Sequence, residues 1–431
     1  MQEMKSTNKR KEILVLIAML ICSISLFQNT AQKSLDDFYD PADDSKSYIS
    51  LSNSLVNTDE FIRTEFKGTD AVETVRTPGY PFFIAKLSFG SFKNIIYLQN
   101  LMHVLSAYFL YKVIEKLIPY KLAYLVFLYY LFHPLLISLS QLFLTETLSI
   151  FLINILIFCL INKKQLFLPA IIISVLPLVR PAFLILMLGM ILMNKVFFNV
   201  TNKKKRFVLI LFLILPTSLW TARNYNLTDQ LIFSSITGMN LLEETASGVM
   251  AINEDIDNGE NLLNIINIEY EERRKWSQTL RNEVELGNIS RVIANAPGRN
   301  PHEVAGAYQK YALEKILENP TETIILICRA LLYNLLEPGD QIYKHVNSLY
   351  NYVFIDFVII FINFINMIFI ILYFLNLIKN KDFLNKEFIF YLFLLIPLLL
   401  LSTPNGRFGI ILLSSAILLT TKHISNFNFQ K

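Results

Sequence analysis

The sequence predicts an all-α polytopic membrane protein with about ten transmembrane helices, and three observations support this prediction. Of the 431 residues, 53% are hydrophobic, and the mean hydropathy is +0.44. The apolar residues form repeated runs of roughly 16 to 29 residues, about the length that a helix needs to cross a bilayer. Lys and Arg gather in short loops that, by the positive-inside rule, are predicted to face the cytoplasm. We therefore expect a multi-pass protein of the cytoplasmic membrane.

Composition and residue spacing exclude several other classes. The net charge is only +4, and the Lys clusters are short and close to the membrane, so a nucleic-acid partner is not expected. Cys22, Cys159 and Cys328 lie in apolar segments without a metal-binding spacing, and the five His are scattered. The residues themselves predict no metal or cofactor site.

The first apolar run, residues 13–27, follows a Lys-Arg-Lys cluster. No clean cleavage site follows it, so we interpret it as the first span and not as a signal peptide, with the N-terminus in the cytoplasm. Residues 29–92 then form a long external loop. The next predicted spans, which are separated by alternating external and Lys-rich turns, cover residues 94–114, 122–139 and 143–161.

Residues 165–198 are predicted to cross the membrane twice. A single helix of that length would extend about 50 Å at roughly 1.5 Å per residue, whereas a bilayer core is about 30 Å thick. Two short spans with Arg180-Pro181 at the outer tip fit both the length and the Lys-rich loops on either side. A further span, residues 207–221, is expected to leave the membrane at Trp220 and Arg223.

Residues 224–336 are predicted to form a small helical extracytoplasmic insertion that ends in an interfacial helix. Its polar part has an acidic excess, and helical spacing over 301–319 ends at Pro320. The parity of the later spans places 322–336 on the outer surface. These later spans cover residues 353–378, 388–402 and 409–423. The expected organisation is thus a transmembrane module 1–223, the insertion 224–336 and the C-terminal segments 337–431.

Six isolated charges fall beside or inside the apolar runs, and the predicted topology places all of them near the outer face. They are Asp44, Arg76, Glu146, Arg180, Arg223 and Arg407. Ionisable groups at a hydrocarbon boundary are costly and therefore mark functional sites. Their convergence predicts charged chemistry at the external membrane surface.

The first external loop holds the densest group of these residues. It carries several Asp residues that end in Asp43-Asp44, then Tyr48, and it closes with Arg76-Thr77-Pro78-Gly79-Tyr80-Pro81. The simplest interpretation is an acidic, solvated loop followed by a turn that Pro and Gly favour. An Arg at a helix end can also simply extend to lipid headgroups, which explains Arg223 better than Arg76.

Several motifs together resemble the GT-C glycosyltransferases, in particular the bacterial branch related to protein O-mannosyltransferases and the lipid A aminoarabinose transferase. They are Asp44 to Tyr48, the Arg76 to Pro81 motif, Leu144-Thr145-Glu146, Arg180-Pro181, Trp220-Thr221-Ala222-Arg223-Asn224-Tyr225 and Gly406-Arg407-Phe408. The resemblance extends over most of residues 10–420. It implies a GT-C fold and the transfer, with inversion, of a sugar from a polyprenyl-phosphate donor on the external face.

The resemblance also implies roles for individual residues. An Asp of the first loop takes the proton from the acceptor hydroxyl; Asp44 fits the family spacing to Tyr48, and Asp43 is the nearest alternative. Arg76, Arg223 and Arg407 are candidates for binding the donor phosphate, because a guanidinium binds phosphate bidentately and stays ionised.

The remaining candidates, expected to bind substrate or to support the site, are Tyr48, Tyr80, Glu146 and Arg180. Glu146 either contacts the first loop, an Arg or the sugar, or forms a structural pair with Arg180. Tyr48 and Tyr80 either contact the sugar or lipid, or belong to the aromatic belt common at membrane interfaces.

The acceptor expected from the resemblance is a cell-envelope glycan, lipid or protein. Compared with larger family members, the insertion is small and no large C-terminal domain follows. The alternatives are a polysaccharide polymerase, which would depend on a large late external loop, and a flippase or transporter, which usually has internal repeats and midplane charges. The sequence shows neither repeats nor midplane charges.

Overall fold

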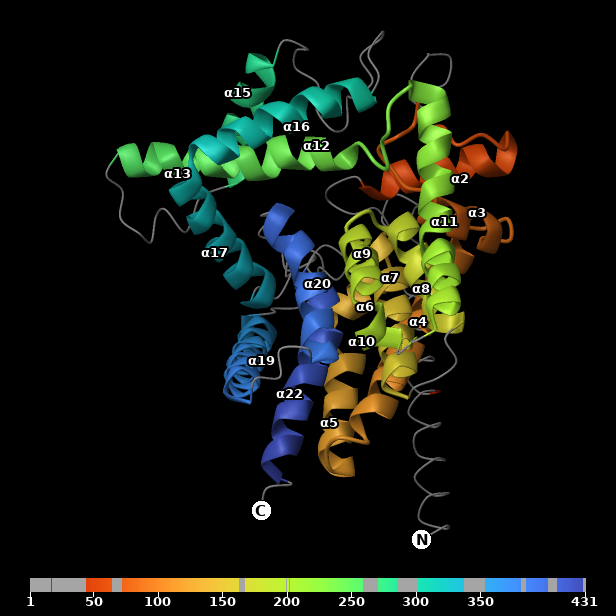
Figure 1. Ribbon diagram of the computed structural model, residues 1–431, viewed down its shortest axis with the longest axis vertical. Helices are drawn as coiled ribbons and strands as arrows, with labels where there is room; N and C mark the ends of the chain where they lie inside the picture. Colours follow the sequence, from red (N-terminus) through yellow and green to blue (C-terminus); the bar gives the residue numbers. More distant parts are fainter. Residues whose placement is uncertain are drawn as a thin grey trace.

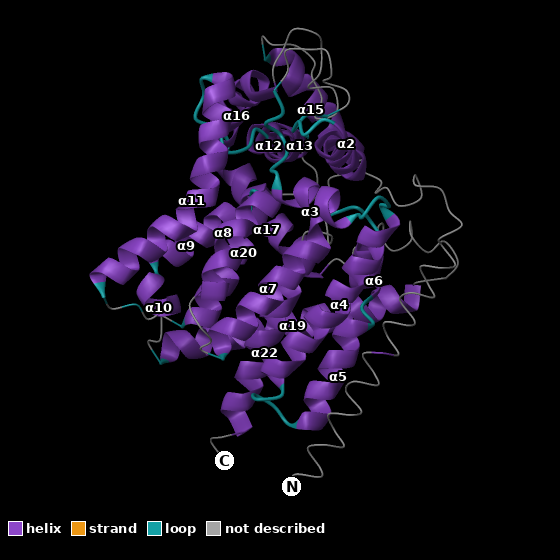
Figure 2. Cartoon of the chain, turned by 90° about the vertical axis from the view of Figure 1, so that its right-hand side faces the viewer, coloured by secondary structure: helices purple, strands orange, loops and turns teal. Residues whose placement is uncertain are grey.

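The computed structural model is shown in Figure 1. It describes residues 17, 44–63, 72–162, 167–198, 200, 202–258, 270–284, 301–336, 353–380, 385–401 and 409–428. Within these ranges the chain consists of helices and connecting loops, without a β-strand (Figure 2). The predicted all-α class is therefore confirmed. Asp43, Arg407 and nearly all of the predicted first span lie outside the described residues.

The body of the molecule is a bundle of apolar helices that stand roughly upright in Figure 1. Its N-terminal helices are α4 (Lys93–Ile114), α5 (Tyr120–Leu131), α6 (Pro134–Ser140), α7 (Thr145–Ile161), α8 (Phe167–Val179), α9 (Phe183–Leu192) and α10 (Asn194–Phe198). Helix α7 packs against both α4 and α8. The main hydrophobic core runs through this bundle.

Two helix breaks fall where the sequence has an X-Pro pair, because the residue before a proline is disfavoured in helical conformation. His133 is extended, and α5 and α6 are bent by 48° across it. Helix α8 ends at Val179, and α9 begins after Arg180-Pro181. The predicted division of residues 165–198 into two helices is confirmed at this position.

Helix α11 (Lys203–Thr228) is longer than the sequence predicted. The side chain of Asn202 accepts hydrogen bonds from the amides of Lys204 and Lys205 and caps its N-terminus, and the helix ends at Asp229 in the left-handed region. The helix therefore extends beyond the predicted span 207–221, and the residue at which it leaves the membrane stays a prediction. Trp220 and Arg223 lie within the helix, which continues for more than another turn.

A layer of helices crosses the upper end of the bundle in Figure 1. Its members are α12 (Ile236–Asn240), the π-helix η3 (Leu241–Ala246), α13 (Ser247–Asp257), α15 (Tyr270–Glu283) and α16 (Pro301–Glu318). They share a small core that includes Met239, Leu242 and Tyr308. The described part of the predicted insertion is therefore helical, and the predicted helix end at Pro320 is confirmed. Helix α17 (Pro320–Leu336) leads down from this layer and packs against α13, α19 and α20.

The C-terminal helices complete the bundle. They are α19 (Val353–Lys379), α20 (Lys386–Leu401), the short 3-10 helix η4 (Ile410–Leu412) and α22 (Leu413–Asn428). Helix α22 packs against both α19 and α20.

Two described helices are long and apolar enough to cross a membrane, namely α11 and residues Ile360–Lys379 of α19. The bent pair of α5 and α6 provides a third if the two count as one broken span. Shorter apolar helices, among them α7, α8 and α9, run beside them. The protein thus has the character of a helical membrane protein, and the number of ten spans stays a prediction.

Candidate active site

The candidate site lies at the upper end of the bundle (Figure 1), where α2 (Asp44–Asn57) packs against α3 (Gly79–Leu87) and the loop between them contacts α11. Asp44 is the first residue of α2, where a carboxylate is favoured by the helix dipole. Arg76 belongs to the loop that precedes α3, and its Nη2 lies 2.6 Å from Oδ1 of Asp44. The Asp44 side chain is 25% exposed and the Arg76 side chain 16%, so the pair is partly accessible from outside the fold.

Tyr48 lies one helical turn after Asp44 and forms a platform beneath Arg76. The guanidinium carbon of Arg76 is 4.9 Å from the centre of the Tyr48 ring, and Nη1 is 3.5 Å from the Tyr48 hydroxyl. Tyr80 meets the Tyr48 ring edge-on at 5.0 Å. Tyr80 is completely buried, so it supports Tyr48 from within the protein and does not offer a free face to a ligand.

The charges around Tyr48 show which residues the fold brings together. Burial raises the pKa of Tyr48, the carboxylates of Asp44 and Glu146 raise it further, and Arg76 and Arg180 oppose them. For Arg76, burial alone would lower the pKa, but the charge and hydrogen bond of Asp44, together with the electrostatic effects of Tyr48 and Glu73, outweigh it and the pKa is raised. Arg76 therefore stays fully charged, and two acid–arginine pairs lie around one buried tyrosine.

The second pair joins α7 to the break between α8 and α9. Nη1 of Arg180 is 2.9 Å from Oε1 of Glu146, and it also lies 3.5 Å from the Thr145 hydroxyl. Glu146 is completely buried, whereas Arg180 is 15% exposed. The first turn of α7 is thereby tied to the break between the next two helices.

The glycine of the Arg76 to Pro81 motif allows a close approach between two helices. A Cβ atom at Gly79 would lie 2.7 Å from the backbone carbon and oxygen of Leu178, which no real side chain tolerates. Only glycine therefore permits α3 to pack directly on the end of α8. This contact places the motif immediately beside Arg180.

Arg223 has a different environment from Arg76. Its Nη1 donates to the backbone carbonyl of Glu73 at 2.8 Å and to Oδ1 of Asn224 at 2.9 Å. Its guanidinium also stacks on Trp220 at 4.9 Å and on Phe61 at 5.6 Å. These contacts join α11 to the first loop, and no contact with Asp44 is among them. Its predicted phosphate role stays a prediction, as does that of Arg407, which lies outside the described residues.

Two buried residues that the sequence analysis did not single out hold this site together. Glu73 accepts hydrogen bonds from the backbone N–H groups of Val75 and Arg76. Gln99, in α4, accepts from the Tyr80 hydroxyl at 2.6 Å and donates to the carbonyls of Ser140 and Leu142. A polar residue inside an apolar run was a usable signal for Gln99. For Glu73, the sequence offered only one signal, its position three residues before Arg76.

An apolar groove of about 620 Å³ lies between α9 and α11. Its lining includes Leu184, Met187 and Leu188 on α9, together with Ile214, Thr217 and Thr221 on α11. Thr221 is in the same helical turn as Trp220 and Arg223. The groove thus runs along α11 up to the level at which that helix contacts the first loop.

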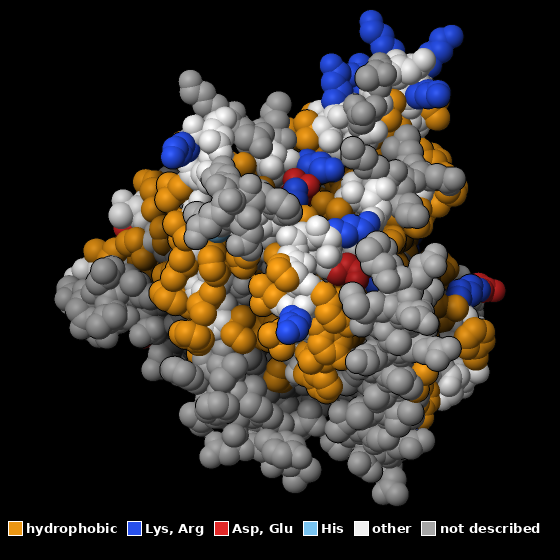
Figure 3. All heavy atoms as spheres, turned by 90° about the horizontal axis from the view of Figure 1, so that it is seen from below, with side chains coloured by type: hydrophobic (Ala, Val, Ile, Leu, Met, Phe, Trp, Pro, Cys, Tyr) orange, Lys and Arg blue, Asp and Glu red, His pale blue; other side chains and the backbone are white. Residues whose placement is uncertain are grey.

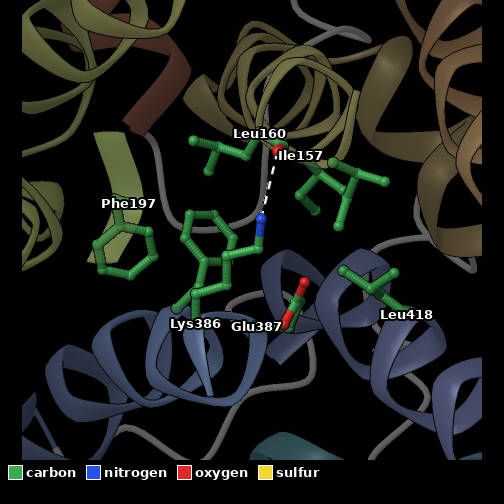
Figure 4. Close-up of a pocket in the computed structure, with 8 residues that line it drawn as sticks. Ile157, Leu160, Phe197, Lys386, Glu387 and Leu418 are labelled. Atoms are coloured by element: carbon green, nitrogen blue, oxygen red, sulfur yellow. Dashed lines mark hydrogen bonds between the residues drawn. The ribbon is translucent and has the colours of Figure 1, made fainter. Parts of the chain in front are cut away.

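A second cavity, shown in Figure 4, lies among α7, α10, α20 and α22. It is lined by apolar side chains such as Ile157, Phe197 and Leu418, with Lys386 and Glu387 beside them. Its volume is about 20 Å³, which is room for roughly one water molecule. It is therefore too small to hold a substrate.

No group of three or more His, Cys, Asp or Glu side chains capable of holding a metal ion occurs in the part of the chain that the structure describes. Comparison of the chain with protein-family models, with curated proteins and with solved structures finds no match. A carboxylate beside a permanently charged guanidinium can serve proton removal and binding of an anion within one site.

Proposed function

We propose that this protein is a GT-C-type glycosyltransferase of the cytoplasmic membrane. It moves a sugar from a polyprenyl-phosphate donor to a cell-envelope glycan, lipid or protein on the extracytoplasmic face. The observation that carries the proposal is the 2.6 Å contact between Asp44 and Arg76. This contact joins the two residue types that the reaction needs, a carboxylate base and a phosphate-binding cation, at the end of an apolar helical bundle.

In the proposed reaction, Asp44 accepts the proton of an acceptor hydroxyl as that oxygen bonds to the anomeric carbon of the sugar. The bond from this carbon to the phosphate oxygen breaks, and the polyprenyl phosphate leaves with additional negative charge. Arg76 stabilises that charge, which develops in the transition state. Attack from the side opposite the leaving phosphate inverts the anomeric configuration.

The apolar groove between α9 and α11 supports a lipid-linked donor. Its mainly apolar lining suits an isoprenoid chain, and about 620 Å³ accommodates part of one. We place the chain of the donor in this groove, with its phosphate toward the first loop. The residues that could reach the phosphate are then Arg76, Arg223 and Arg407.

The distribution of Lys and Arg supports the proposed orientation of the protein in the membrane. Lys203, Lys204 and Lys205 are exposed at the start of α11, at the end opposite the candidate site. Seen from below in Figure 3, Lys and Arg side chains lie at one margin of the face and also among the apolar side chains nearer its centre. By the positive-inside rule we assign this end to the cytoplasm and the Asp44 end to the outside. Ten spans with both termini inside belong to the same proposal.

The experiment uses the full-length protein in lipid vesicles with a radiolabelled polyprenyl-phosphate hexose and cell-envelope extract as the acceptor source. We expect release of free polyprenyl phosphate coupled to labelled product. Movement of intact donor across the bilayer without cleavage would indicate a transporter instead. Growth of long chains from preassembled repeat units would indicate a polymerase.

Arg76→Ala is expected to weaken binding of a synthetic polyprenyl phosphate by about tenfold or more, because a charge-assisted hydrogen bond is lost. Arg76→Lys keeps the charge but not the planar fork and should recover only part of the affinity. Unchanged affinity in Arg76→Ala would remove Arg76 from the phosphate role.

A further inference from the structure

We propose that Glu73 is a positioning residue that fixes Arg76 for the donor phosphate. This inference rests on the proposed function, in which Arg76 binds that phosphate. It adds a residue to the site that makes no contact with substrate and acts only through Arg76.

The carboxylate of Glu73 holds the backbone from which Arg76 projects. Its Oε1 accepts the N–H of Val75 at 2.8 Å and the N–H of Arg76 at 3.0 Å. Its Oε2 accepts from Nε of Arg63. One oxygen thus fixes the turn of the chain at residues 75 and 76, and the other is tied to a buried arginine.

The backbone carbonyls of this turn accept hydrogen bonds from α11 and from the segment that follows α11. Arg223 donates to the carbonyl of Glu73 at 2.8 Å. The N–H of Ser235 donates to the carbonyl of Thr74 at 2.9 Å, and the hydroxyl of Ser234 donates to the carbonyl of Val75 at 2.7 Å. We call residues 73–76 the strap. Three successive carbonyls of the strap are bound to α11 and to the segment that follows it.

The backbone of the strap is therefore fixed to the rest of the protein, while one of its side chains extends into the candidate site. Glu73, Arg223 and the 234–235 segment immobilise its backbone, whereas the Arg76 side chain extends from it to Asp44. An arginine side chain is long and flexible, so its placement depends on the backbone that carries it. Misplacement of a positioning group by about 1 Å can cost roughly 100-fold in rate.

Glu73 cannot itself exchange a proton with substrate. Its side chain is completely buried, and both of its oxygens are occupied by groups of the protein. This burial separates it from Asp44, whose carboxylate is one-quarter exposed.

The test compares Glu73→Ala with Glu73→Gln in the full-length protein, using a synthetic polyprenyl phosphate as the probe. Glu73→Ala removes both backbone hydrogen bonds and should weaken probe binding by about tenfold. Glu73→Gln keeps a carbonyl oxygen for the two N–H groups, but its amide NH2 would face the Nε donor of Arg63, so it is combined with Arg63→Met and should then recover most of that loss. Glu60→Gln changes an exposed acid in the same loop and should bind like the wild type.

A double-mutant cycle separates positioning from general loss of structure. If Glu73 acts through Arg76, then Glu73→Ala adds no further loss of affinity in an Arg76→Ala background. Additive losses would overturn the proposal, and so would wild-type affinity in Glu73→Ala. Because Glu73→Ala leaves buried Arg63 without this partner, the combination Arg63→Met with Glu73→Ala provides a second variant that removes both charges.

Amide hydrogen exchange tests the positioning role of Glu73 without relying on the proposed function. The amides of Val75 and Arg76 should exchange at least about tenfold faster in Glu73→Ala than in the wild type or in Glu73→Gln combined with Arg63→Met. If the wild type binds no polyprenyl phosphate, the proposed function fails, and the exchange rates still report whether Glu73 holds the strap. Unchanged exchange in Glu73→Ala would refute the positioning role directly.

Discussion

Arg180, in the break between α8 and α9, donates a 2.9 Å hydrogen bond to the completely buried carboxylate of Glu146 in α7. The two residues are 34 positions apart in the chain. The pair fixes the first turn of α7 against the break between the next two helices. Tyr48 lies near both charges, so this structural contact also forms one wall of the candidate site.

Arg180→Met should destabilise the protein strongly because it leaves the Glu146 carboxylate buried without its cation. The expected loss is about 3–5 kcal/mol in the free energy of unfolding, measured by denaturant titration in mixed micelles. Adding Glu146→Gln to this variant removes the charge and should restore part of the stability. A loss below about 0.5 kcal/mol in Arg180→Met would show that the pair is not structurally important.

Gly79→Ala should separate α3 from α8. The added Cβ would lie 2.7 Å from backbone atoms of Leu178, which cannot move away as a flexible side chain could. We expect a loss of about 1–3 kcal/mol in unfolding free energy, accompanied by weaker binding of polyprenyl phosphate. Gly306→Ala is the matched control, because nothing lies within 4 Å of its Cβ position. The control should be neutral or slightly stabilising, by about 0.5–1 kcal/mol; equal stabilities for the two variants would contradict the close packing.

Gln99→Leu should lower stability by about 1–3 kcal/mol, because three buried polar groups each lose a hydrogen bond. These groups are the Tyr80 hydroxyl and the carbonyls of Ser140 and Leu142. Tyr80→Phe removes only one of these hydrogen bonds and should therefore lower stability by less than Gln99→Leu does. Thermal unfolding of the three proteins side by side checks this order. A Gln99→Leu variant as stable as the wild type would mean that α4 needs no polar contact at this position.

Tyr48 should remain uncharged throughout the physiological pH range, because burial and the nearby carboxylates raise its pKa above the usual 10.0. In the unfolded chain the phenol ionises near pH 10, so the folded state holds this proton more tightly. The resulting contribution to stability is complete below pH 10 and is lost only as the pH rises toward the folded-state pKa.

The tyrosinate absorbance of the wild type minus that of Tyr48→Phe measures this ionisation. The difference should show no titration up to pH 10 in the folded protein. A transition below pH 10 would place Tyr48 in a more solvated environment than the one described here.

The sequence predicted those parts of the fold that depend on local chemistry. Apolar length and the Arg180-Pro181 pair predicted the break between α8 and α9, whereas the bend at His133, inside the predicted span 122–139, was not predicted. The end of α11 was not predictable in the same way. Its last turns carry polar residues, and contacts of Trp220, Arg223 and Asn224 with the neighbouring loop accompany the continued helix.

The candidate site was predicted as a set of residues, with the Glu146–Arg180 pair as one of two interpretations of Glu146, whereas the Asp44–Arg76 pair was not predicted. Resemblance and isolated charges pointed to Asp44, Arg76, Glu146 and Arg180. Which acid meets which arginine depends on how α2, α7 and the 180–182 break pack together, and sequence spacing does not contain that information. Glu73 was missed for a related reason, since its contacts are largely to backbone N–H groups, which every residue type but proline carries.

The most direct test of the account is the rate of sugar transfer by Asp44→Asn, measured in a single turnover with the full-length protein in lipid vesicles. Loss of a general base predicts a fall of about 10²–10⁴-fold in that rate, while binding of the polyprenyl-phosphate donor is largely kept. A variant that transfers sugar as fast as the wild type would contradict the assignment of Asp44 as the base and, with it, the proposed mechanism.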